Sequence, residues 1–217
     1  MKPIFPKSAD FIVRLAGAFL GISVLTGVAA YTYLTHPMVQ DTGYRPVQPV
    51  PYSHKLHAGN LGMDCYYCHN TVTKAGHAAV PSTETCMNCH TRVKTASSAL
   101  APVRESYATG KPVEWVKVHI LPDYAYFNHS AHVTAGVSCV SCHGRVDQMV
   151  EVQQVKPLNM GWCLECHRNP APNLRPAELV TKLDWEPPAG KTAAEIGNEI
   201  LRAKNLNPPV HCGGCHR

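Results

Sequence analysis

The cysteines of this chain follow one repeated pattern, which constrains the fold more than any other feature of the sequence. All ten cysteines belong to five Cys-x-x-Cys pairs, and a histidine follows the second cysteine every time. This spacing is the attachment signature of c-type haem, in which two thiols bond the porphyrin and the adjacent histidine binds the iron. The sequence therefore predicts five covalently bound haem c groups. The predicted attachment residues are Cys65, Cys68, His69, Cys86, Cys89, His90, Cys139, Cys142, His143, Cys163, Cys166, His167, Cys212, Cys215 and His216.

Two other kinds of site also use paired Cys-x-x-Cys motifs. Structural zinc sites gather four such ligands around one ion, and redox dithiols use a single reactive pair. Neither explains why a histidine follows every pair with no cysteine left over. Haem c is attached on the outer face of an energy-transducing membrane, so the pattern also predicts a periplasmic location for this part of the chain.

A longer pattern occurs twice along the chain. His54-Lys-Leu-His57 precedes the first two attachment motifs, and His129-Ser-Ala-His132 precedes the third and fourth. Such internal similarity indicates a duplicated structural unit. We expect two di-haem modules, at about residues 52–91 and 126–170, with a fifth haem site at about residues 211–217.

Each iron can take a second axial ligand from the remaining histidines or from a methionine. His54, His57, His129 and His132 are the first candidates, because a spacing of three residues on a helical turn presents two imidazoles to different haems. His119 is the next candidate. Two weaker candidates are His77, whose alternative is a solvated surface histidine, and His211, which immediately precedes Cys212. His36 lies close to the membrane exit and is expected to be an interfacial histidine.

Met160 is the candidate for a methionine ligand, which would raise the potential of its haem. It lies three residues before Cys163. The alternative is a methionine that packs against a haem ring, since the thioether fills irregular apolar spaces well. Both interpretations of Met160 are open at this point.

The composition leaves little material for an ordinary hydrophobic core. Residues 41–217 provide about 35 residues per haem, with only four Phe and three Trp in the whole chain. Eighteen Pro and fifteen Gly favour loops. We predict a multihaem cytochrome c fold, mostly irregular, with short α-helices wrapped around a haem stack and little β-structure. One helix is expected over Lys191–Asn205, where apolar residues recur at helical spacing despite Gly197.

The N-terminus contains a hydrophobic segment, Leu15–Leu34, that is long enough to cross a membrane. Its twenty residues carry no charge and would span about 30 Å as a helix. We predict an uncleaved anchor over residues 1–40, with its helix at about residues 12–34 and the start of a tether. The alternative is a signal peptide cleaved near Val28-Ala-Ala30. Gly17 and Gly21 form a G-x-x-x-G motif that could pack against another membrane helix.

The predicted location is the bacterial inner (cytoplasmic) membrane, crossed once. Lys2, Lys7 and Arg14 precede the apolar run and keep the N-terminus in the cytoplasm. Residues 41–217 then form a periplasmic pentahaem domain, which agrees with the compartment in which haem c is attached. The formal net charge is +5, and two propionates from each of five haems would change it to about −5. The basic composition therefore does not predict a nucleic-acid partner.

Three segments of the chain resemble the membrane-anchored pentahaem c-type cytochrome subunit of alternative complex III. They are Tyr44–Gly59, Val118–His132 and Pro157–Arg168. The resemblance implies a quinol-oxidising membrane complex with an iron–sulfur protein, multi-span quinol-binding subunits and a monohaem cytochrome, and with a terminal oxidase as a further candidate partner. It also implies that the second axial ligands are His54, His57, His119, His129 and His132, and it leaves the role of Met160 open.

The predicted function is electron transfer through the haems towards a periplasmic cytochrome or terminal oxidase, without a catalytic site in this chain. One alternative is a stand-alone membrane-anchored quinol dehydrogenase that feeds a periplasmic reductase. A second is a multihaem reductase of the nitrite type, which needs an iron with a free position inside a pocket. We consider the second less favourable, because all five motifs end in histidine and the chain per haem is short.

Overall fold

A computed structural model describes residues 5–6, 8–40 and 42–216 of the chain. Lys2 and Lys7, which entered the topology prediction, lie outside the described residues, as does Arg217 of the predicted fifth haem site. The chain divides into two compact units, Met1–Asp41 and Thr42–Arg217, and each is described by itself.

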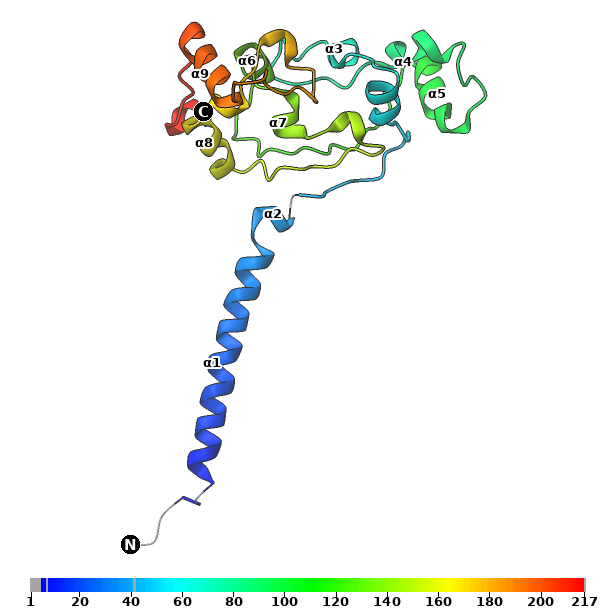
Figure 1. The fold of residues 1–217 in the computed structure, drawn as a ribbon. Helices are drawn as coiled ribbons and strands as arrows, with labels where there is room; N and C mark the ends of the chain where they lie inside the picture. Colours follow the sequence, from blue (N-terminus) through cyan, green and yellow to red (C-terminus); the bar gives the residue numbers. More distant parts are fainter. Residues whose placement is uncertain (1–4, 7, 41, 217) are drawn as a thin grey trace. The chain divides into compact units, whose positions relative to one another are not determined.

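The first unit is dominated by the helix α1, Ala9–Leu34 (Figure 1, blue). Its 26 residues correspond to a length of about 39 Å, and none of them is buried. The helix begins three residues before the predicted start, with Asp10 in its first turn, where a carboxylate suits the helix dipole. Its length and apolar composition are sufficient to cross a membrane. A short helix, α2, Pro37–Gln40, follows it.

Two threonine hydroxyls at the C-terminal end of α1 bond to carbonyls of the helix. The Thr32 hydroxyl donates to the carbonyls of Val28 and Ala29, both at 3.0 Å, and the Thr35 hydroxyl donates to that of Tyr31 at 2.7 Å. Such internal bonding is what a polar group in a lipid environment requires.

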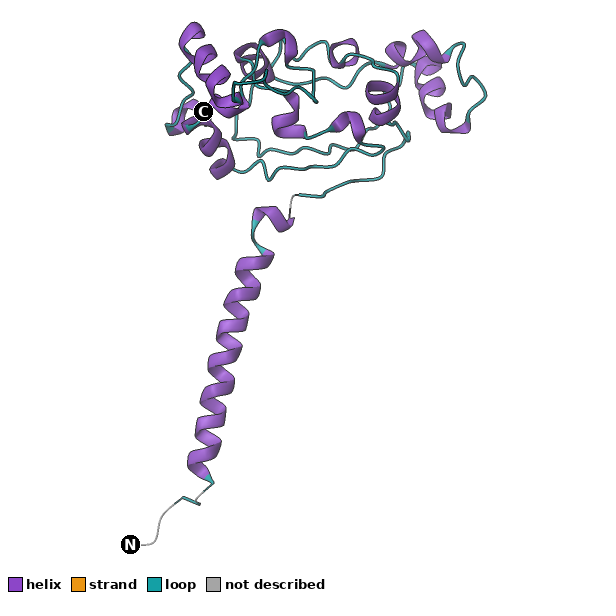
Figure 2. Ribbon diagram, in the orientation of Figure 1, coloured by secondary structure: helices purple, strands orange, loops and turns teal. Residues whose placement is uncertain are grey.

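The second unit consists of short helices joined by long irregular segments (Figure 2). Among the described residues it has no strand, only an isolated antiparallel bridge between Val137 and Leu174. This confirms the predicted fold class. The α-helices are α3 (Cys65–Cys68), α4 (Thr83–His90), α5 (Ala101–Thr109), α6 (His129–Ala135), α7 (Cys139–His143), α8 (Met160–Arg168) and α9 (Ala193–Lys204). A π-helix forms Lys55–Asn60, and 3₁₀ turns form Ser98–Leu100, Val146–Gln148, Ala171–Asn173, Ala177–Leu179 and Cys212–Gly214.

Every attachment motif lies wholly or partly on one of these short helical elements. Polar residues fix where three of the helices in this region begin, because their side chains accept a backbone N–H of the first turn. Asp64 accepts from Tyr66 at 2.8 Å, Asn128 from Ala131 at 3.3 Å and Asn159 from Trp162 at 2.8 Å. Local sequence therefore determines the start of α3, α6 and α8.

The hydrophobic core of the described residues is small. Its largest cluster joins Val50, Met87 and Val103, with partly buried Trp115 packed against it. Few other apolar side chains are buried, and they are scattered: Val72, Ala171, Leu174, Val180 and Ile196. A chain of this size normally buries a much larger apolar core. The protein alone therefore supplies only part of the buried surface that this fold needs.

Helix α9 agrees with the predicted helix, and its glycine has a structural reason. Thr192 and Glu195 form a capping box at its start, which defines the first turn. A side chain at Gly197 would overlap the backbone of Ala171, so only glycine allows α9 to pack this closely on the neighbouring 3₁₀ turn. The residue that weakens the helix propensity is therefore the one that fixes its position.

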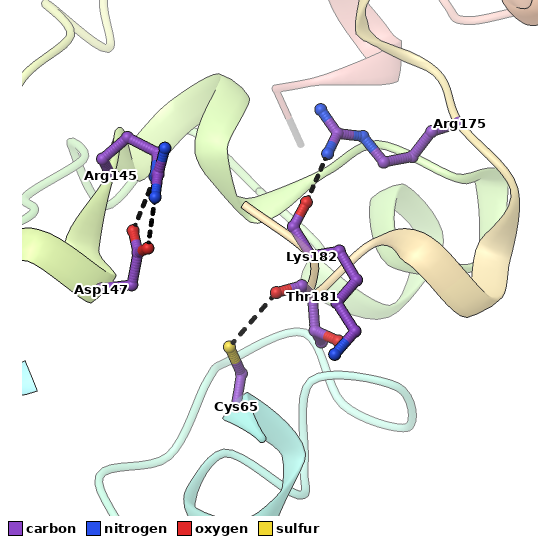
Figure 3. A network of polar contacts seen from close by, with 6 residues as sticks. All are labelled: Cys65, Arg145, Asp147, Arg175, Thr181 and Lys182. Carbon is purple, nitrogen blue, oxygen red and sulfur yellow. Dashed lines mark hydrogen bonds and ion pairs between the residues drawn. The ribbon is translucent and has the colours of Figure 1, made fainter. Parts of the chain in front are cut away.

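One segment after α8, residues 174–182, connects the two predicted modules (Figure 3). Arg175 N–H donates to the Gly136 carbonyl at 2.9 Å, and the buried Ser138 hydroxyl donates to the Val180 carbonyl at 2.8 Å. The Thr181 hydroxyl donates to Asp64 at 3.0 Å. These contacts join the start of α3 to the start of α7.

Candidate haem-binding sites

The imidazoles of the two His-x-x-His pairs lie opposite the attachment histidines at one characteristic separation. Two imidazoles on opposite faces of one metal ion, each bound at about 2 Å, have ring centres about 6 Å apart. In the first module, the ring centres of His54 and His69 are 6.5 Å apart and nearly parallel, at 5°. Those of His57 and His90 are 6.3 Å apart, at 65°.

The second module repeats this arrangement. The ring centres of His129 and His143 are 6.4 Å apart, at 9°, and those of His132 and His167 are 6.0 Å apart, at 34°. In both modules the first histidine of the pair faces the first attachment motif, and the second faces the second. All four separations suit an iron held between two imidazoles.

Hydrogen bonds orient most of these rings for metal binding. When Nδ1–H donates to a carbonyl, the tautomer is fixed and Nε2 is left for the metal. Among the attachment histidines, His69, His90, His167 and His216 lie 2.7–3.0 Å by Nδ1 from the carbonyls of Ala79, Val93, Pro209 and Tyr124. Among the opposed histidines, His57, His129 and His132 lie 2.7–2.9 Å by Nδ1 from those of Ser53, Gly76 and Asn128.

Burial keeps several of these imidazoles neutral, which is the form that binds a metal. Burial and then the neighbouring His69 lower the pKa of His54 to about 4. Burial lowers that of His143 to about 3, and burial also lowers the pKa of His132. Burial raises the pKa of Cys142 to about 12. A redox dithiol needs a lowered thiol pKa, so this thiol does not fit that alternative.

An aromatic ring holds the histidine pair of each module. Tyr52 stacks on His57, with ring centres 4.5 Å apart at 21°, and meets His54 edge-on at 4.8 Å. Phe127 stacks on His132 at 4.5 Å and 30°, and meets His129 edge-on at 4.7 Å. In each copy the aromatic residue lies two positions before the first histidine. The pattern was present in the sequence, but the role of these rings was not predicted.

The fifth motif, Cys212–His216, lies beside the fourth. Burial and then Cys215 raise the pKa of Cys163, and the Pro209 carbonyl contacts His167. The Tyr126 N–H donates to the Cys215 carbonyl at 2.8 Å. The ring that lies nearest His216 in the described structure is that of Tyr124, at 5.6 Å.

The other candidate ligands are placed less specifically. Met160 begins α8, one turn before Cys163, and its side chain is 65% exposed. His36, His77 and His211 are exposed. His119 does not face an attachment histidine at the separation of the four pairs. Its ring centre is 4.3 Å from that of His143, and the two rings are nearly perpendicular, at 85°.

The five motifs follow one another in space in a different order from that in the chain. The second motif neighbours the first, because the Asn88 side chain donates to the Tyr67 hydroxyl at 3.1 Å. The first motif neighbours the third. Burial raises the pKa of Cys65 to about 11, and the nearby Cys139 is the next largest cause. The third motif neighbours the fourth. After burial, the nearby Cys166 and Cys163 are the largest causes that raise the pKa of Cys142. The order is therefore second, first, third, fourth, fifth.

A buried cation next to the third motif also suits a haem. The Arg175 guanidinium is buried, donates to the Lys182 carbonyl at 2.7 Å and lies over the Trp185 ring. Burial lowers the pKa of Arg175, and the nearby Cys139 raises it by a smaller amount. Its Nε has no hydrogen-bond partner among the described protein atoms. A haem propionate is the kind of anion that such a group binds. Sequence reasoning missed Arg175, because nothing local distinguishes it from an exposed arginine.

The residues present therefore fit c-type haem. The structure shows no grouping of three or more His, Cys, Asp or Glu side chains suited to a metal ion within the described residues. The ligands are instead arranged as opposed pairs beside Cys-x-x-Cys motifs. This is the arrangement that an iron porphyrin needs and that a four-ligand zinc site does not have.

Comparison with known proteins finds similarity to a cytochrome c family and to a curated multihaem cytochrome. Residues 50–105 match the family described as cytochrome c7 and related cytochrome c. The chain is 37% identical over 97 residues to the multihaem cytochrome c subunit of menaquinone reductase from Nitratidesulfovibrio vulgaris. The aligned part is 44% of this chain and 45% of that relative, so the match spans less than half of either protein.

Proposed function

We propose that this chain is the electron-transfer subunit of a quinol-oxidising respiratory membrane complex. The match of residues 50–105 to cytochrome c7 and related cytochrome c supports this proposal. The chain carries five covalently bound haem c groups and passes electrons towards a periplasmic cytochrome or a terminal oxidase. The observation that carries this proposal is the set of four opposed imidazole pairs, with ring centres 6.0–6.5 Å apart.

Bound haem c supplies one-electron redox chemistry. The role of the protein chain is to hold and orient the haem groups. His54, His57, His129 and His132 bind from one side, and the attachment histidines bind from the other. Two axial imidazoles leave no free position at which a substrate could bind, which favours electron transfer over catalysis.

Met160 is the proposed candidate for the second ligand at the fifth site. It lies one turn before Cys163 on α8, and Cys215 is near enough to Cys163 to raise the pKa of that thiol, after burial. A histidine–methionine site at the end of the series would have a higher potential than the bis-histidine sites. This would make the fifth site the natural exit for electrons, and the second motif the opposite end.

The membrane and its complex are the proposed setting. The apolar helix α1 is long enough to anchor the chain, and we propose one crossing of the inner (cytoplasmic) membrane with the haem domain in the periplasm. The relative from Nitratidesulfovibrio vulgaris is a subunit of a menaquinone reductase, which supports a quinone-linked complex here. The proposed partners are those of alternative complex III: an iron–sulfur protein, multi-span quinol-binding subunits and a monohaem cytochrome.

Extraction of native membranes in mild detergent tests this proposal. The chain should co-purify with multi-span and iron–sulfur subunits, as identified by mass spectrometry. Its haem content, measured as the pyridine haemochrome against protein concentration, should be five per chain. If it is extracted alone and oxidises quinol by itself, it is a stand-alone quinol dehydrogenase. If the reduced chain binds carbon monoxide at several haems, the proposed electron-transfer function is wrong.

A further inference from the structure

His119 lies outside every attachment motif, yet its ring contacts that of His143, the attachment histidine of the third motif. His119 Nε2 is 3.2 Å from His143 Nδ1, and the ring centres are 4.3 Å apart. An iron between two imidazoles separates the ring centres by about 6 Å. The contact is therefore a hydrogen bond between two imidazoles and leaves no space for a metal between them.

This hydrogen bond distinguishes the third site from the others. The other four attachment histidines place Nδ1 against backbone carbonyls, those of Ala79, Val93, Pro209 and Tyr124. Only His143 has a side chain in that position. A backbone carbonyl cannot be replaced by mutation, whereas His119 can.

The tautomers follow from the geometry. His143 faces His129 across the separation of an axial pair, so its Nε2 is the metal-binding atom and its Nδ1 carries the proton. Nδ1–H then donates, and Nε2 of His119 accepts. His119 is therefore neutral, with its own proton on Nδ1. Burial lowers the pKa of His119, which agrees with a neutral ring.

The extended segment that carries His119 is held at two points. The Gln48 side chain accepts from the N–H of Val116 at 3.0 Å and donates to its carbonyl at 2.8 Å. The neighbouring Trp115 packs against the cluster of Val50, Met87 and Val103. The chain therefore fixes this segment three residues before His119, which limits how far the imidazole can move from His143.

We propose that His119 is a positioning residue for the third haem, which orients His143 and increases its basicity by accepting its Nδ1–H. This role differs from the axial ligation predicted for His119. It rests on the proposed function, because it takes His143 as an iron ligand. A more basic imidazole stabilises the oxidised iron, so His119 lowers the potential of the haem in the middle of the spatial series.

Redox titration of the purified full-length chain tests this, with low-temperature EPR of the oxidised state as a second measurement. In His119→Phe the ring volume is kept and the acceptor is lost. We expect all haems to be retained and one of them to become easier to reduce, by about tenfold in its reduction equilibrium, or about 59 mV. Its low-spin EPR signal should shift. In His119→Gln, which keeps an acceptor, most of the shift should be recovered.

His36→Leu is the matched control, because it removes an exposed imidazole from outside the haem domain. If His119→Phe does not accumulate, His119→Leu provides the same loss with a smaller side chain. Unchanged potentials and EPR signals in a fully haem-loaded variant would refute the positioning role alone. A new high-spin haem that binds carbon monoxide would show that His119 is an axial ligand instead. A wild-type chain without haem c would overturn the proposed function itself.

Discussion

The two predicted di-haem modules, at about residues 52–91 and 126–170, share one geometry but differ in what supports it. In each, an aromatic residue stacks on the second histidine of the pair, and ring centres across the site are 6.0–6.5 Å apart. In the first module His57 lies in a π-helix whose N-cap is His54, whereas in the second both histidines lie in the α-helix α6. His129 Nδ1 contacts the Gly76 carbonyl, while the equivalent His54 Nδ1 is buried and has no partner among the described protein atoms.

The difference shows which part of the site the repeat determines. The aromatic residue, the two histidines and the Cys-x-x-Cys-His motif are local in sequence and recur in both copies. The second histidine of each pair also has a local partner, the carbonyl four residues before it, in both copies. The first histidine differs, because a distant segment orients His129 whereas His54 Nδ1 has no partner among the described protein atoms. Gly76, whose carbonyl orients the His129 ring, comes from the first module. The second module therefore depends on the first for the orientation of His129.

The largest effect is expected from removing a haem from the middle of the series. In Cys139→Ala with Cys142→Ala, the third haem loses its covalent attachment, and few buried apolar side chains remain to hold the fold. We expect failure to accumulate, or a chain one haem short with a much lower melting temperature. The readouts are haem staining and thermal denaturation followed in the Soret band.

The matched control is Cys212→Ala with Cys215→Ala, at the end of the series. It should lose one haem with a smaller loss of stability. Equal loss in both double variants would contradict the inference that the third site lies at the centre of the structure.

The next largest effect is expected from removing the first histidine of the pair in either module. His54→Ala and His129→Ala should each convert one low-spin haem to a high-spin haem that binds carbon monoxide when reduced, because an axial imidazole is lost. EPR and carbon monoxide difference spectra measure this. His77→Ala, which removes an exposed imidazole, is the control. A low-spin spectrum in either variant would show that the ring pair does not hold an iron.

A smaller effect tests the aromatic supports. Tyr52→Leu and Phe127→Leu each remove a ring that contacts two histidines, and each should cost about 1–3 kcal/mol of stability. We expect the larger change in EPR line shape for Tyr52→Leu, because His54 lacks the hydrogen bond that fixes His129. Denaturant unfolding and EPR of both variants provide the comparison. Greater broadening in Phe127→Leu would contradict it.

These comparisons also show what the sequence could predict. The attachment motifs, the histidine pairs and helix α9 were predictable, because each depends on the chemistry of neighbouring residues. The apolar N-terminal segment was predictable for the same reason, since length and composition alone decide whether a helix can cross a membrane. The position of α1 agrees with that expectation to within three residues at its start.

The remaining features depend on contacts between distant segments. His119 is predicted as an axial ligand from its residue type and from the family resemblance. Its contact with His143 could not be predicted, because it depends on how the segment after Val113 packs. Arg175 is buried only because residues 174–182 lie between the modules. The spatial order of the motifs likewise follows from the path of the whole chain. No local pattern encodes these three features.

The smallest expected effect concerns the segment that joins the modules. Its contact with the second module is buried: Ser138 is 1% exposed and its hydroxyl donates to the Val180 carbonyl. Its contact with the first module, between Thr181 and Asp64, is exposed. Ser138→Ala should cost about 1 kcal/mol of stability, because it leaves a buried carbonyl unpaired. Thr181→Val should cost less, since water replaces the lost bond at an exposed site.

Chemical denaturation of the haem-loaded variants measures both costs. The double variant is informative as well, because residues held by the same segment are expected to interact energetically. If the two losses add without an interaction energy, each contact holds its own module independently. If the double variant loses less than the sum, the segment couples the modules, and breaking its exposed contact already releases part of the buried one. The second outcome is expected, because only one residue separates Val180 from Lys182, whose carbonyl also holds Arg175.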